Sequence, residues 1–186
     1  MDDGGEEAYS MMSLDLILSP DLRTSSMKVS RLLRKMGGGY ESLLLNLPRE
    51  MEEGVMELAS KHISCDEFID EACRSRLIPE PVGSWEYALK PVLEALPQLS
   101  RRFPSLRMYC YGSSEHEFAS IGVAVSFARL ALKTALTGDV EVNEWRDALR
   151  RSLDVDGDAT EDEAGAIVER VEGSSMCISD LGGRGL

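Results

Sequence analysis

The 186-residue sequence has little of the material from which most metal and nucleic-acid sites are built. It holds two histidines and four cysteines, and no two cysteines stand as C-x-x-C, so a structural zinc site is not predicted. No run of lysine and arginine forms the basic face that phosphate binding requires, and nucleic acid is not a predicted partner. Neither G-x-G-x-x-G nor a P-loop is present, so dinucleotide binding has no motif to support it.

Export and membrane signals are also missing. The chain begins with an acidic stretch in place of the basic and apolar regions of a signal peptide. The longest uncharged part of its most apolar helical segment, residues 118–128, is shorter than the roughly 20 residues of a membrane span. Cys65 and Cys73 lie eight positions apart in one predicted helix, about 12 Å, too far for a disulfide. We therefore expect reduced thiols and a cytoplasmic protein with no membrane partner.

The composition is that of a folded chain, with 43% hydrophobic and 28% charged residues. The net charge of −13 is concentrated in two segments, residues 1–15 and 139–172, while the rest of the chain is balanced. This distribution predicts a neutral core domain with acidic extensions. The predicted divisions are a disordered acidic lead (1–10), an α/β core domain (11–138), an acidic helical extension (139–173) and a flexible tail (174–186).

Apolar runs alternate with segments of helical periodicity along the core. Strands are predicted at 11–18, 40–47 and 105–112, and helices at 24–36, 48–61, 65–73, 85–96, 115–137, 142–152 and 161–172. The order favours an α/β fold: a small, mostly parallel sheet of about three strands covered by helices, with a helix-rich C-terminal part. The segment 115–137 carries so few charges that we expect protein to cover most of it. Because the sheet is small, we expect part of the core to be covered by a partner protein, by a second copy of the chain or by a continuation of the chain itself.

Polar residues follow the predicted strands where ligands bind in parallel α/β sheets. Ser19 and Asn46 stand at the ends of the first two strands, and Gly112, Ser113 and Ser114 follow the third. At that third position, free N–H groups at the start of a helix suit an anion or an oxyanion. These five residues form the predicted ligand site. The alternative is that Ser114 only caps the helix.

A catalytic hypothesis uses the same edge of the sheet. Glu115 and His116 could act as acid and base or hold a divalent metal, with Asp21 nearby. Such a hydrolase requires these three residues and Asn46 around one pocket. Cys110 alternates with apolar neighbours along a strand, which indicates a core residue rather than a nucleophile for His116.

The segment 152–163 has the spacing of a calcium loop. Acidic residues occupy its third, fifth, seventh and twelfth positions, and Gly157 occupies the sixth. The predicted metal ligands are Asp154, Asp156, Asp158 and Glu163. The competing interpretation is a solvated acidic linker in which Thr160 and Glu163 form a capping box.

Three short motifs carry a family resemblance. They are Ser19-Pro20-Asp21 after a strand, Leu43-Leu44-Leu45-Asn46-Leu47-Pro48 before an acidic helix, and Arg107-Met108-Tyr109-Cys110-Tyr111. Over residues 12–137 the chain resembles the superfamily of TraB, ChaN and erythromycin-esterase-like proteins. The resemblance implies a hydrolytic or metal site built from a His at the first strand end and a Glu before the proline. Leu18 and Asn46 stand at those positions, so it also implies lost chemistry or a site made by other residues.

These observations favour a non-catalytic binding or interaction module with a ligand site at the strand ends. Two alternatives remain: a metal-assisted or acid/base hydrolase, and a calcium-responsive protein acting through residues 152–163. The partner of the favoured function is a small molecule or another protein, and a divalent metal is the cofactor of the alternatives.

Overall fold

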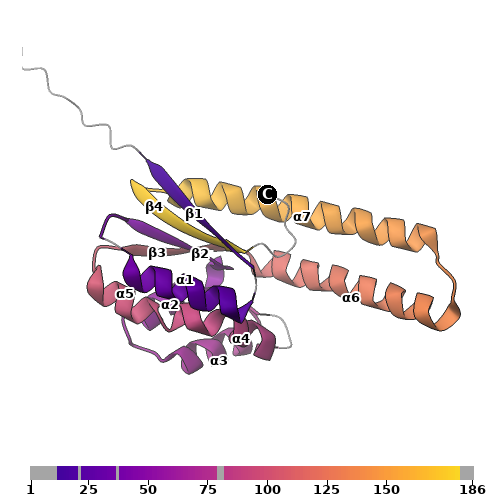
Figure 1. The fold of residues 1–186 in the computed structure, drawn as a ribbon, viewed down its shortest axis with the longest axis horizontal. Coiled ribbons are helices and arrows are strands. Elements are labelled where there is room, and N and C mark those ends of the chain that lie inside the picture. The colour runs from indigo at the N-terminus through magenta and orange to yellow at the C-terminus, as the bar shows by residue number, and fades with distance from the viewer. Residues whose placement is uncertain (1–11, 21, 37, 79–81, 181–186) are drawn as a thin grey trace, which may run out of the picture.

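The structure is a computed structural model that describes residues 12–20, 22–36, 38–78 and 82–180 (Figure 1). Its strands are β1 (Ser13–Ser19), β2 (Ser42–Pro48), β3 (Arg107–Gly112) and β4 (Ser174–Asp180). Its helices are α1 (Arg23–Lys35), the short 3₁₀ turn η1 (Arg49–Met51), α2 (Glu52–Ala59), α3 (Cys65–Arg74), α4 (Val82–Leu93), α5 (Leu96–Arg102), α6 (Ser114–Thr137) and α7 (Val142–Arg170). The predicted α/β class is confirmed, with 65% of the described residues in helices and a helix-rich C-terminal part. The described sheet has four strands where about three were expected.

All strand pairs are parallel, and the strand order is β1-β4-β2-β3. The last strand therefore lies between the first two, and the predicted flexible tail is wrong for residues 174–180. Met176 and Ile178 face one side of the sheet and Ser175 and Cys177 the other, all of them buried. The apolar run of this strand, Met176 to Ile178, has three residues and is flanked by serines. So short a run does not predict a central strand. The rest of the tail, 181–186, and the predicted lead, 1–10, lie outside the described residues.

Helices α1 to α5 lie along one side of the sheet (Figure 1). On that side β2 contributes Leu43, Leu45 and Leu47, which alternate along the strand and are at most 3% exposed. They pack with residues of α1, α2, α3, α4 and α5 in one core. Helices α2 to α5 belong to the connection between the neighbouring strands β2 and β3, and α1 belongs to the crossover from β1 to β2. Both connections join parallel strands of one sheet and pass over the same face, as right-handed crossovers in the same direction do.

Among the described residues, the C-terminal half of α7 is the segment that packs on the other side of the sheet. Leu44, Tyr111 and Cys177 meet Ala166 there in a small second core. The edge strand β1 lies beyond it, and its Leu16 is 48% exposed.

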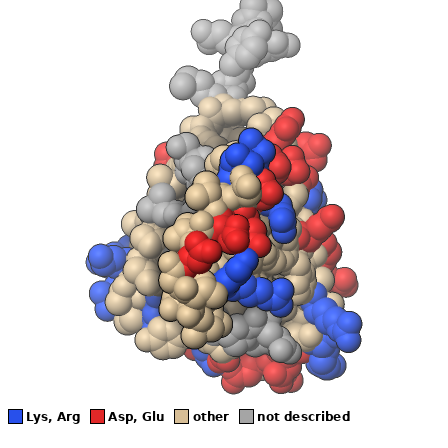
Figure 2. Space-filling view, turned by 90° about the vertical axis from the view of Figure 1, so that its right-hand side faces the viewer, with Lys and Arg blue, Asp and Glu red and all other residues tan. Residues whose placement is uncertain are grey.

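Helices α6 and α7 form a long antiparallel hairpin that extends past the sheet (Figure 1). Acidic and basic side chains both appear on the side of the molecule toward which the hairpin extends (Figure 2). Gly138 ends α6 in the left-handed conformation, as expected of a C-terminal glycine. The expectation that protein covers α6 is wrong for this structure, because Val123 is its one buried residue. Among the described helices α6 alone has the length and apolar composition of a membrane span, a test that core helices of soluble proteins also pass.

Candidate functional site

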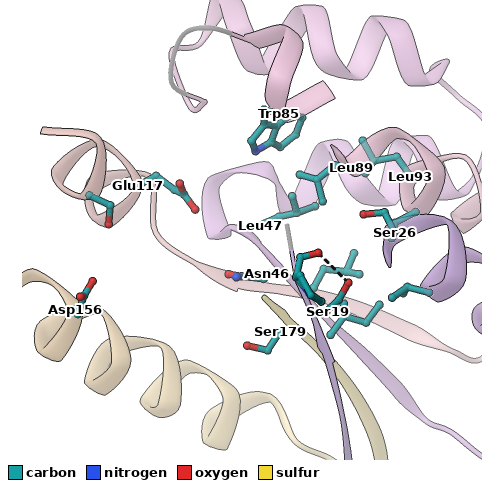
Figure 3. Close-up of a pocket in the computed structure, with 16 residues that line it drawn as sticks. Ser19, Ser26, Asn46, Leu47, Trp85, Leu89, Leu93, Glu117, Asp156 and Ser179 are labelled. Carbon is teal, nitrogen blue, oxygen red and sulfur yellow. Dashed lines mark hydrogen bonds between the residues drawn. The ribbon is translucent and has the colours of Figure 1, made fainter. Parts of the chain in front are cut away.

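A cavity of about 260 Å³ opens at the carboxyl ends of the strands (Figure 3). Residues from three strands and from helices α1, α4, α6 and α7 enclose it. Its lining consists of Ser19, Pro20, Ser26, Val29, Leu45, Asn46, Leu47, Trp85, Leu89, Val92, Leu93, Glu117, Ser120, Asp156, Ile178 and Ser179. It lies where the sequence predicts a ligand, and Ser19 and Asn46 belong to it.

The two sides of the cavity differ in chemistry (Figure 3). Trp85, Leu89 and Leu93 of α4 form an apolar side, while Glu117 of α6 and Asp156 of α7 stand on the opposite side. Trp85 and both carboxylates are partly exposed, so a ligand can reach them. The cavity therefore offers an apolar surface and acidic groups to the same molecule.

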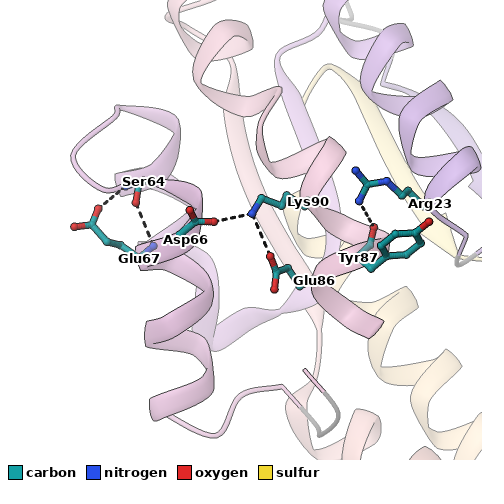
Figure 4. A network of polar contacts seen from close by, with 7 residues as sticks. All are labelled: Arg23, Ser64, Asp66, Glu67, Glu86, Tyr87 and Lys90. Atoms are coloured by element: carbon teal, nitrogen blue, oxygen red, sulfur yellow. Dashed lines mark hydrogen bonds and ion pairs between the residues drawn. The ribbon is translucent and has the colours of Figure 1, made fainter. Parts of the chain in front are cut away.

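Ion pairs and hydrogen bonds hold the apolar side in place (Figure 4). Lys90 of α4 contacts Asp66 of α3 at 2.7 Å and Glu86 of its own helix at 3.1 Å, and these carboxylates raise the pKa of Lys90. The predicted capping box at the start of α3 is confirmed: Ser64 donates its N–H to Glu67, which lowers the pKa of that carboxyl. The Lys90–Asp66 ion pair links the capped helix α3 to α4, the helix that carries Trp85.

Asn46 lies at an irregularity of β2, where the register with β3 shifts between Leu45 and Pro48. Its amide oxygen Oδ1 is buried and has no hydrogen-bond partner among the described residues. The backbone of Gly112 approaches this point so closely that a Cβ there would stand 2.9 Å from the Leu47 carbonyl oxygen and 3.2 Å from Oδ1. Gly112 thus permits the close approach of β3 but does not line the cavity.

The start of α6 is not the predicted anion site. Ser113 and not Ser114 is the N-cap, because the helix begins at Ser114, and the Ser113 side chain makes no capping hydrogen bond. The Ser114 hydroxyl instead donates to Glu50 Oε1 at 3.1 Å. The carboxylate of Glu50 therefore already lies beside the start of α6, and its negative charge disfavours an anionic ligand there. Ser113 and Ser114 lie outside the cavity lining.

Two of the proposed acid/base residues, Glu115 and His116, lie outside the lining of the cavity. His116 Nε2 lies 3.6 Å from Asp162 Oδ2, and Asp162 is paired with Arg49 at 2.5 Å. Glu115 is exposed, neither it nor His116 lines the cavity, and Asp21 lies outside the described residues. Cys110 is a core residue as predicted, and burial raises the pKa of its thiol far above the ordinary value.

The predicted calcium loop is wrong, because residues 152–163 lie inside the continuous helix α7. At 3.6 residues per turn Asp154 and Asp158 share one side of the helix, while Asp156 points to another and reaches the cavity. The described residues contain no group of three or more His, Cys, Asp or Glu that could hold a metal ion. Glu163 is buried at 9% exposure, away from solvent-facing Asp154 and Asp158.

Sequence reasoning missed three residues as parts of one site: Trp85, Glu117 and Asp156. Each sits on a helix whose orientation over the strand ends is set by packing, and no local motif assigns them to this cavity. The comparisons add no assignment, because no family model, no curated protein and no solved structure matches the chain.

Proposed function

We propose that the chain is a binding module that holds a small organic molecule in the strand-end cavity. The observation that supports this function is the cavity itself, with apolar walls and a few polar groups converging on one space. Such a mixture is typical of small-molecule sites, in which apolar contact supplies affinity and polar groups fix orientation.

Binding without chemistry is favoured over hydrolysis. A hydrolase of the expected kind needs Glu115 and His116 beside Asn46, and the first two do not line the cavity. The Cys110 thiol is buried and its raised pKa keeps it neutral, so it is a poor nucleophile. The polar residues that do line the cavity supply no histidine or cysteine among the described residues.

The test uses the neutral probe 3-phenylpropanol and the fluorescence of Trp85. The chain has two tryptophans, and Trp145 stacks near Phe127 on the hairpin, so Trp145→Phe leaves Trp85 as the reporter. We expect a saturable change in Trp85 emission and a higher melting temperature with the probe, because a ligand of the folded state stabilises it.

A blocking variant and a matched control decide whether the cavity is responsible. Ser120→Phe places a large side chain at the cavity and should abolish the saturable change. Ser126→Phe makes the same change on the same helix, outside the lining, and should leave binding intact. A linear, non-saturating response, or equal binding by both variants, would contradict the proposal.

A further inference from the structure

The polar groups of the cavity are rich in hydrogen-bond acceptors and negative charge. They comprise two carboxylates, one amide and several hydroxyls, and none of the described lining residues is lysine, arginine or histidine. An anionic ligand would therefore find no cationic partner among these described lining residues and would face the carboxylates of Glu117 and Asp156. This arrangement excludes phosphates and carboxylates as preferred ligands on electrostatic grounds.

The acceptors belong to three separate elements that surround the space (Figure 3). Glu117 comes from α6, Asp156 from α7 and Asn46 from β2. Asp156 accepts a long hydrogen bond of 3.4 Å from the Ser152 hydroxyl, a neutral group that leaves its charge in place. The Asn46 oxygen lacks a donor among the described residues. A half turn of the side-chain amide would move the oxygen to the position that the nitrogen now holds. There the oxygen could accept a hydrogen bond from an N–H group of a ligand.

The opposite wall suits the rest of such a ligand. Trp85 presents an indole ring, a large apolar surface for the body of the ligand. Leu89, Leu93 and Val29 continue the apolar surface toward the floor of the cavity. A molecule with a positively charged end and an apolar body matches both walls at once.

We propose that the ligand is a small organic cation, a primary ammonium group carried on an apolar body of about the size of a phenylpropyl chain. This inference rests on the proposed binding function and specifies its ligand class. The ammonium donates to the carboxylates of Glu117 and Asp156, and the apolar body packs on Trp85 and Leu89.

The test compares three probes of the same shape: 3-phenylpropylamine, 3-phenylpropanol and 3-phenylpropionate, which are cationic, neutral and anionic at neutral pH. In the Trp145→Phe protein we expect the amine to bind at least about tenfold more tightly than the alcohol, the effect of one partly screened ion pair. The propionate should bind at least about tenfold more weakly than the alcohol.

The double variant Glu117→Gln, Asp156→Asn should reduce the affinity for the amine to that for the alcohol while the alcohol still binds. The matched control Glu161→Gln, Glu169→Gln removes two exposed carboxylates of α7 and should keep the preference. Equal binding of amine and alcohol by the starting protein would overturn the cation assignment and leave the binding function standing. Failure of all three probes would overturn both.

Discussion

The two faces of the sheet are covered by different amounts of packed protein. One face carries five helices and a core that extends from β2 through α1 to α5, with Leu43 fully buried. The other face carries half of one helix, whose contact with the sheet is a small cluster around Leu44 and Cys177. Beside that cluster the leucines of β1 are exposed, Leu16 by 48%.

This difference separates the part of the molecule that stabilises the fold from the part that selects the ligand. The five-helix face buries enough apolar surface to hold the sheet, and it also supplies the apolar wall of the cavity through α4. The hairpin face contributes little burial but delivers Glu117 and Asp156, the acidic wall. We therefore expect the fold to depend mainly on the first face and the choice of ligand mainly on the second.

The largest expected effect compares two leucines of the sheet. Leu43→Ala removes a fully buried side chain from the five-helix face and should lower the free energy of unfolding by about 2–5 kcal/mol. Leu16→Ala on the other face removes a half-exposed side chain and should cost less than about 1 kcal/mol. Urea denaturation followed by circular dichroism measures both. Equal losses would mean that the two faces are buried alike.

A second, smaller effect compares two buried thiols, Cys110 under the five helices and Cys177 under α7. Burial raises the pKa of Cys177 to about 11, so at neutral pH each thiol must be exposed by opening before it reacts. Because α7 is held by few contacts, its local opening should make Cys177 react with N-ethylmaleimide at least about tenfold faster than Cys110. Peptide mass spectrometry after timed labelling gives both rates.

Two alanines of α7 provide the control for this comparison. Ala166 lies in the contact with the sheet and Ala164 is exposed. Ala166→Glu should accelerate labelling of Cys177 without changing that of Cys110, while Ala164→Glu should change neither. If Cys110 and Cys177 were labelled at equal rates in every variant, α7 would leave the sheet only when the whole protein unfolds.

The same contrast separates what the sequence predicts from what it does not. On the five-helix side the signals are local: Pro48 at the end of β2, Ser64 and Glu67 at the start of α3, and the periodic apolar residues of α1. Those elements were predictable to within a few residues. β4 was not, because its partners lie more than a hundred positions away in the chain and its apolar run is three residues long.

The candidate site divides in the same way. Ser19 and Asn46 follow from their positions at strand ends, a rule of topology that needs no side-chain packing. Trp85, Glu117 and Asp156 depend on how α4, α6 and α7 are turned over that edge. In α7 the local signals even favoured a break, yet Ala159 is fully buried there, and such contacts sustain the helix through it.

The smallest expected effect tests whether α7 is continuous at Gly157. The test is the sign of the change in unfolding free energy that one substitution causes. Gly157 lies within α7 and an added Cβ would meet no atom within 4 Å, so Gly157→Ala should raise the free energy of unfolding by about 0.5–1 kcal/mol. In a calcium loop the same glycine would make the sharp turn, and alanine would lower stability. Gly165→Ala, at an equally open position of α7, should match the increase. Thermal unfolding of both variants measures the sign, and a lower melting temperature for Gly157→Ala alone would place a bend, and not a helix, at this residue.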